Sequence, residues 1–204
     1  MTKVAALYVE KGGVYYEPGL DVEPWDIERD ARLYAGPWPV VAHPPCSRWC
    51  KPLAWVNQTR YGHKVGDDGG CFAFALATVR KFGGVLEHPA ESYAWQKFDL
   101  PRPPRRGWTR GLCGGWSCSV SQRAYQHRAR KQTWLYAFGV GGPPSVDWSR
   151  PPAVALVSHM NPANKAMPRL SPKEAKATPV PFRDLLLSIA RTATPAPTSR
   201  PVKP

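Results

Sequence analysis

Three short segments carry side chains that could act together in covalent chemistry. Cys46 ends the segment AHPPC (residues 42–46), Glu87 lies in GVLEHP (84–89), and two arginines lie in QHRAR (126–130). The steps from Cys46 to Glu87 and from Glu87 to Arg128 are both 41 residues. A thiolate is a nucleophile near neutral pH, a carboxyl group can hydrogen bond or protonate a ring nitrogen, and a guanidinium group pairs with carboxylates and phosphates. This combination suits nucleophilic catalysis.

Apolar segments before the thiol and the carboxyl group predict the strands that position them. Residues 39–42 (PVVA) are one such run, and residues 85–86 follow a helical pattern that ends at two glycines. Strands that alternate with helices favour a parallel sheet, whose ligand chemistry lies outside the carboxyl ends of the strands. We therefore predict an α/β fold with a Rossmann-like, mostly parallel sheet and flanking helices, forming one compact domain over residues 1–192. Residues 193–204 are rich in Pro, Thr and Ser and predict a disordered tail.

Hydrophobic patterning predicts the other elements. We expect further strands at residues 4–9, 114–120 and 133–140, with 14–16 as a hairpin partner of the first. Helices are expected at residues 24–33, 67–82 and 178–191, and a capping box at 171–174 predicts one more short helix. The segments 47–66 and 141–170 are predicted to be loops.

Composition limits the classes of protein. The 204 residues are 43% hydrophobic, which is enough for a core, and no apolar run approaches the roughly 20 residues that span a bilayer. Five cysteines, an odd number, argue against a disulfide framework. A structural zinc stays open as an alternative because Cys46 and Cys50, and Cys113 and Cys118, are closely spaced, but the predicted site contains no metal. We expect a soluble protein of the cytoplasm.

Positive charge is concentrated in the second half of the chain. The net charge is +13, yet residues 1–99 hold 11 Lys or Arg and 12 Asp or Glu, whereas residues 100–204 hold 17 and 3. Such one-sided charge favours binding to nucleic-acid phosphates, although a solvated basic surface is the plainer alternative. The side chains predicted to contact DNA are His43, Arg48, Trp49, Arg105, Arg106, Arg110, Gln126 and Lys131.

The order Pro-Cys, Glu, then Gln-x-Arg-x-Arg, at these intervals, resembles the cytosine-C5 DNA methyltransferases. The resemblance covers roughly residues 38–140. It implies that Cys46 adds as a thiolate to carbon 6 of a base flipped out of DNA, which makes carbon 5 reactive. Glu87 would contact ring nitrogen N3, a role that needs a raised pKa, and Arg128 and Arg130 would hold Glu87, a phosphate or the base carbonyl. His88 stands where the family usually has Asn, and Gln122 is a second candidate for the glutamine.

The resemblance also implies S-adenosylmethionine as the methyl donor, but the family's glycine loop is not evident before Cys46. Gly12 and Gly13 after the first strand, with Asp26, are the candidate cofactor residues. Because this region is short, two alternatives stay open. One is an enzyme that takes its one-carbon unit from methylene-tetrahydrofolate, and the other is a non-catalytic DNA-binding protein. A small basic form of a DNA-modifying enzyme suggests a phage product in a bacterial host.

Overall fold

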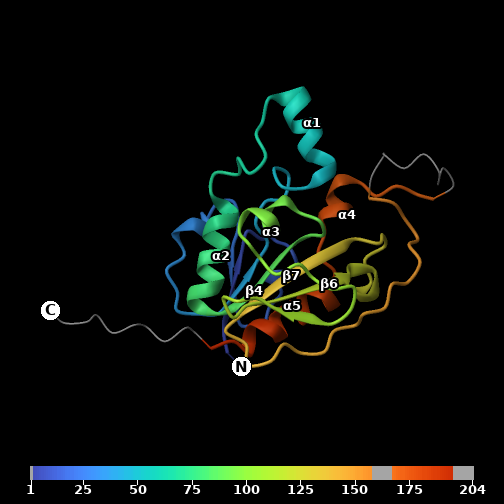
Figure 1. Ribbon diagram of the computed structural model, residues 1–204. Helices are drawn as coiled ribbons and strands as arrows, with labels where there is room; N and C mark the ends of the chain where they lie inside the picture. Colours follow the sequence, from blue (N-terminus) through green and yellow to red (C-terminus); the bar gives the residue numbers. More distant parts are fainter. Residues whose placement is uncertain (1, 158–166, 195–204) are drawn as a thin grey trace.

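The computed structural model describes residues 2–157 and 167–194, and its centre is one seven-stranded sheet with helices on both faces (Figure 1). The strands are β1 (Val4–Leu7), β2 (Val22–Trp25), β3 (Val40–Ala42), β4 (Gly84–Pro89), β5 (Trp108–Arg110), β6 (Trp116–Ser121) and β7 (Gln132–Phe138). Their order across the sheet is β2-β1-β3-β4-β7-β6-β5. The α/β class is therefore confirmed.

The sheet is mixed, so the prediction of a mostly parallel sheet is wrong. The pairs β1–β2, β1–β3 and β3–β4 are parallel, whereas β4–β7, β7–β6 and β6–β5 are antiparallel. Connection length explains the difference. Parallel neighbours need a crossover of about a dozen residues or more. Only residues 111–115 join β5 to β6, and residues 122–131 join β6 to β7, so these strands return antiparallel.

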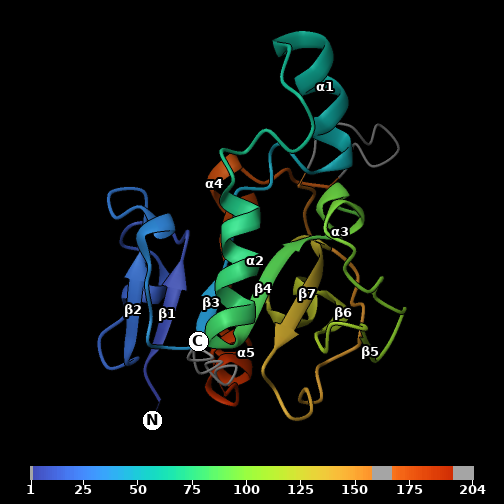
Figure 2. The same cartoon turned by 60° about the vertical axis from the view of Figure 1, so that its left-hand side comes forward.

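Two helices cover the sheet. The helices are α1 (Lys51–Tyr61), α2 (Cys71–Phe82), α3 (Tyr93–Lys97), α4 (Pro172–Lys176) and α5 (Val180–Arg191), and the 3-10 turns are η1 (Val14–Tyr16), η2 (Ala31–Leu33) and η3 (Gln122–Tyr125). Helix α2 packs on β3, β4 and β7, while α5 packs on β1, β3 and β4 from the other face (Figure 2). Successive strand residues therefore point alternately into two apolar layers.

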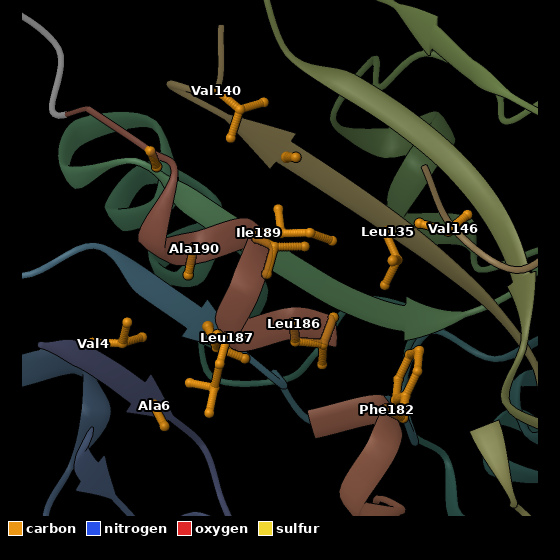
Figure 3. Close-up of a cluster of buried hydrophobic side chains, with 14 of the residues drawn as sticks. Val4, Ala6, Leu135, Val140, Val146, Phe182, Leu186, Leu187, Ile189 and Ala190 are labelled. Atoms are coloured by element: carbon orange, nitrogen blue, oxygen red, sulfur yellow. The ribbon is translucent and has the colours of Figure 1, made fainter. Parts of the chain in front are cut away.

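The layer under α5 shows how the helix is held. Phe182, Leu186 and Ile189 lie on one side of α5 and are fully buried in a cluster with side chains of β1, β3, β4 and β7 (Figure 3). Burying a side chain of this size stabilises the fold by about 1.5–3 kcal/mol. The predicted amphipathic helix is confirmed, although Pro179 rather than Thr178 is its N-cap residue. The short helix with a capping box at Ser171 is also confirmed.

Helix α2 ends at a glycine pair that brings β4 close to β3. Gly84 has φ +127°, and a Cβ atom there would lie 2.0 Å from the carbonyl oxygen of Val40. At the other end of α2, the carboxylate of Asp68 accepts hydrogen bonds from the amides of Gly70 and Phe72. Asp68 at the start of α2 and the glycine pair at its end therefore determine where this helix begins and ends.

Several local predictions are wrong. Residues 14–16 form η1 rather than a hairpin strand, and β1 pairs in parallel with β2 and β3. The expected helix at 24–33 is replaced by the end of β2 and by η2, with Ile27 and Leu33 exposed. The segment 47–66 contains α1, which projects from the body of the protein in both views (Figures 1 and 2).

The described residues contain no membrane-spanning helix, and the first two residues of the predicted tail are part of the fold. Within residues 2–157 and 167–194, no helix is long and apolar enough to cross a membrane. Of the predicted tail, Ala193 is buried and the amide of Thr194 donates to the carbonyl of Gly139, so these two residues belong to the fold. Residues 195–204 lie outside the described residues.

Candidate active site at the carboxyl ends of the parallel strands

Cys46 follows the carboxyl end of β3, as predicted, and lies in a tight turn. The amides of Trp49 and Cys50 donate to its carbonyl oxygen at 2.9 and 3.0 Å. This turn brings the Cys50 thiol to Cys46, and the hydrogen bond between them lowers the pKa of Cys46. Lys131 lowers it further, while burial and the charge of Glu87 act in the opposite direction. The pKa of Cys50 is raised by the same bond, so Cys46 is the more easily ionised thiol.

Glu87 lies inside β4 and joins a buried polar chain on the α5 face of the sheet. Its side chain is 10% exposed. One carboxylate oxygen pairs with Nδ1 of His43 at 3.0 Å, and the other accepts a hydrogen bond from Nε2 of Gln122 at 3.2 Å. Beyond them, the Tyr15 hydroxyl contacts Nε2 of His43 at 2.8 Å, and Gln122 also donates to Thr133 at 2.9 Å. We refer to these five residues as the polar chain.

The expected rise in the pKa of Glu87 is not found. Burial alone raises the pKa of this carboxyl group, but the hydrogen bond and charge of His43, with Lys131 and His88, outweigh burial and lower it to about 2. Glu87 is therefore ionised in the free protein and acts as a hydrogen-bond acceptor. His43 is the positioning partner, because its own amide donates to the carbonyl of Leu7 at the end of β1.

The two predicted arginines do not hold Glu87. Arg128 forms an ion pair of 2.9 Å with Glu174 of α4, and both Arg128 and Arg130 have exposed side chains. The reason is local. Residues 126–131 form an extended connection in which His127 and Ala129 point inward, so Arg128 and Arg130, which alternate with them, point outward. The cation that acts on both Cys46 and Glu87 is Lys131, whose Nζ donates to the carbonyl of Lys176 at 3.3 Å.

The other predicted DNA contacts separate into two groups. Trp49 is 4% exposed, donates to Asp68 at 2.8 Å and packs on Phe72, so it lies in the core rather than on the surface where a DNA contact is predicted. His43 belongs to the polar chain. Arg105, Arg106, Arg110 and Gln126 are exposed, and Arg48 is half-buried. The first three lie in or before the edge strand β5, on the far side of the sheet from β1 and β2.

The predicted cofactor residues lie at the expected edge but fit S-adenosylmethionine poorly. Gly12 and Gly13 follow β1, and Asp26 follows β2. The carboxylate of Asp26 is buried and already accepts hydrogen bonds from the Tyr16 hydroxyl and from the amides of Glu28 and Arg29. A Cβ atom on Gly12 would meet no atom within 4 Å, so nothing on the described protein closes around this turn. We assign no step to this group.

Three members of the site were not assigned a role from the sequence. Tyr15 and Thr133 have no sequence signal, because their contacts depend on the sheet order. Gln122 was noted only as a second glutamine, and it is this residue, rather than Gln126, that reaches Glu87. The spacing of Cys46 and Cys50 was considered for zinc alone, although one turn between two thiols also brings them together. Among the described residues, no group of three or more His, Cys, Asp or Glu side chains could hold a metal ion.

His88, the neighbour of Glu87 in β4, points into the opposite layer. It is fully buried against Phe72 and Trp95, and its ring lies close to the backbone of Pro45. Burial lowers its pKa from 6.5 to about 4, and the charge of Glu87 offsets this only in part. In the unfolded chain His88 is protonated near pH 6.5, whereas in the folded protein it is protonated only near pH 4. Stability is therefore lost as the pH falls through this window.

Replacing His88 with phenylalanine should remove this acid sensitivity. A shift of this size corresponds to about 3 kcal/mol of unfolding free energy. Urea unfolding at pH 7 and pH 4.5 measures it. The wild-type protein should lose most of that amount between the two values, and His88→Phe should lose little of it. An equal loss in both proteins would contradict this account.

Comparison with known proteins leaves the site to be interpreted from its own geometry. Neither protein-family models, nor curated proteins, nor solved structures give a match to this chain.

Proposed function

We propose that this protein modifies carbon 5 of a pyrimidine base in DNA, with Cys46 as the nucleophile. The observation that carries the proposal is the position of Cys46, four residues after β3, where the charge of Glu87 in the neighbouring parallel strand β4 acts on its thiol and Lys131 acts on both groups. The parallel half of the sheet, with helices on both faces, supports a Rossmann-like interpretation, in which ligands bind outside the carboxyl ends of strands.

The chemistry begins with the thiol. The Cys46 thiolate adds to carbon 6 of the ring, and the electron pair of the C5–C6 double bond moves toward carbon 5. Carbon 5 then takes a proton or an electrophilic carbon. Loss of the original hydrogen from carbon 5 expels the thiolate and restores the double bond. The lowered pKa of Cys46 favours the attacking form, because the thiolate is the nucleophile.

Glu87 has a role in this scheme that suits an ionised carboxylate. Next to a cytosine ring it would accept a hydrogen bond from the exocyclic amino group and favour protonation of ring nitrogen N3. Protonation of N3 would neutralise the negative charge that thiolate addition places on the ring, and the carboxylate would hold the ring in this protonated form. The hydrogen bonds from His43 and Gln122 would keep the carboxylate in one orientation.

The donor of the transferred carbon is a separate matter. S-adenosylmethionine and methylene-tetrahydrofolate are the two candidate donors, and the hydrogen bonds that Asp26 already makes leave it little capacity to bind the first. A non-catalytic DNA-binding protein would not need two hydrogen-bonded thiols near an ionised, buried glutamate. We therefore favour the enzyme over the binding protein.

The test uses a step that needs no donor. Reversible addition of Cys46 makes carbon 5 exchange its hydrogen with solvent. A cytosine-containing oligonucleotide is incubated with the protein in D2O and digested to nucleosides. The mass of each nucleoside is then measured by mass spectrometry. Parallel reactions contain S-adenosylmethionine or methylene-tetrahydrofolate.

Deuterium gain in cytosine, with none in thymine or the purines, is the expected result. An added carbon in one donor reaction would then identify the transfer. No exchange in duplex or single-stranded substrate, by a folded protein that binds the oligonucleotide, would contradict the proposal and favour the binding protein.

A further inference from the structure

A small hollow lined by arginines lies away from the cysteine site. Its volume is about 390 Å³, and its lining residues are Arg105, Arg106, Trp148 and Arg150. The first two precede the edge strand β5, and the others belong to the extended segment 141–157. Segments about 40 residues apart in sequence therefore build one basic hollow, to which Trp148 contributes an apolar wall.

The positive charge of the hollow is uncompensated. Among the residues that the structure describes, none of its three arginines forms a salt bridge. The nearest acidic residue in sequence is Asp147, and its carboxylate accepts a hydrogen bond from the amide of Ser149. Three like charges around one hollow repel each other, so an anion bound among them would be stabilised by all three.

The hollow is held in place by hydrogen bonds rather than by chance contact of long side chains. Arg150 donates from Nη2 to the carbonyl of Arg105 at 3.1 Å, which ties the two walls together. Nearby, Trp108 of β5 donates to the carbonyl of Pro144 at 3.0 Å, and the amide of Asp147 donates to the Tyr125 hydroxyl at 2.7 Å. Trp148 also packs against the core under α5.

The same segment connects the hollow to the cysteine site. After Arg150, the carbonyl of Pro152 accepts a hydrogen bond from Arg123, and the amide of Val154 donates to the carbonyl of Arg128. The segment thus runs beside β6 and η3 toward the edge where α4 lies (Figure 1, yellow to orange). Arg150, Arg123 and Arg128 therefore lie along this segment between the hollow and Lys131, the cation that acts on Cys46.

We propose that the hollow of Arg105, Arg106 and Arg150 binds a backbone phosphate of the DNA strand whose base is presented to Cys46. The choice of a DNA strand as the source of the phosphate rests on the proposed function. Guanidinium groups bind phosphate oxygens through paired hydrogen bonds, and each phosphate contact releases counterions. The contact would set the position of the strand without selecting its sequence.

The experiment removes the three charges and compares the result with an equal loss elsewhere. The test variant is Arg105→Gln/Arg106→Gln/Arg150→Gln. The control is Lys3→Gln/Lys11→Gln/Lys81→Gln, which lowers the net charge equally at positions before β1, after β1 and in α2, away from the edge strand β5. Binding of a labelled oligonucleotide is measured by fluorescence anisotropy over a range of salt concentrations, with inorganic phosphate and deoxycytidine monophosphate as competitors.

We expect the test variant to bind the oligonucleotide at least about tenfold more weakly, and its salt slope to fall by about one. The control should change much less. Equal weakening in both variants, or competition by inorganic phosphate at the concentration of the oligonucleotide itself, would overturn the proposal. The first result would show a general effect of charge, and the second a site for small phosphates.

Failure of this inference and failure of the proposed function give different results. The two are separated by measuring carbon-5 exchange in the wild-type protein alongside oligonucleotide binding by the wild-type protein and both variants. If oligonucleotide binding falls only in the test variant while no protein exchanges deuterium, the hollow binds DNA and Cys46 is not the nucleophile. If exchange occurs and binding falls equally in test and control, the hollow is the part that is wrong.

Discussion

Replacing Cys46 with alanine is expected to abolish deuterium exchange at carbon 5, with a fall of at least about 10³-fold in rate. A fall of that size equals roughly 4 kcal/mol of activation free energy. The physical reason is that without the thiolate no covalent bond forms at carbon 6, and water cannot replace it at the same position. Mass spectrometry of digested oligonucleotide measures the rate, and circular dichroism checks that the variant is folded.

Two further cysteine variants make this prediction specific. Cys50→Ala removes the hydrogen bond that lowers the pKa of Cys46, so exchange should slow at neutral pH and recover as the pH rises. Cys71, on α2, lies outside the site, so Cys71→Ala should exchange at the wild-type rate. Wild-type exchange by Cys46→Ala would show that another group attacks the base and would remove Cys46 from the mechanism.

Glu87→Gln has the second large effect, because one carboxylate serves both stability and chemistry. The pKa of Glu87 falls from 4.5 to about 2 on folding. Its charged form therefore stabilises the folded protein by about 3 kcal/mol above pH 4.5, and this is lost as the pH falls through 2. The glutamine variant should lack that amount at pH 7 and should show no corresponding loss in acid. Its exchange rate should fall by about 10²-fold or more.

Glu174→Gln is the matched control for this loss of a carboxylate. Glu174 lies on α4, is exposed and pairs with Arg128, so the cost should stay within about 1 kcal/mol, with exchange unchanged. Urea unfolding from pH 7 to pH 2 and the exchange assay test both variants. If Glu87→Gln kept the acid dependence of the wild-type protein, the carboxylate would not be the group that the polar chain keeps ionised.

Local signals in the sequence were enough to find the parts of the site that one strand delivers. The apolar run before Cys46 and the glycine pair before Glu87 each mark a strand, and both strands form as predicted. Helix α5 was equally clear, because Phe182, Leu186 and Ile189 repeat at helical spacing. Where an element is determined by one local segment of sequence, the element predicted from the hydrophobic pattern is the one that the structure forms.

Contacts between distant segments could not be predicted in the same way. Arg128 was assigned to Glu87 by motif, but the direction of its side chain depends on how residues 126–131 cross to β7. The partners of Glu87 come from η3, which follows β6, and from the residue after β3, and this depends on the order of the strands in the sheet. Trp49 was ambiguous because an aromatic residue in a loop can stack on a base or fill the loop's own core. The antiparallel half could have been inferred from the two short connections within 108–138.

The alternation of side chains along β4 also protects the fold against mispairing. Glu87 faces the polar chain and His88 faces the aromatic layer of Phe72 and Trp95. A shift of β4 by one residue would exchange the two faces and place an ionised carboxylate among aromatic rings. Burying an unpaired charge there would cost several kcal/mol. The glutamate that we assign to the chemistry thus also fixes the register in which β4 pairs with its neighbours. A strand with an apolar residue at this position would tolerate a shifted register more easily.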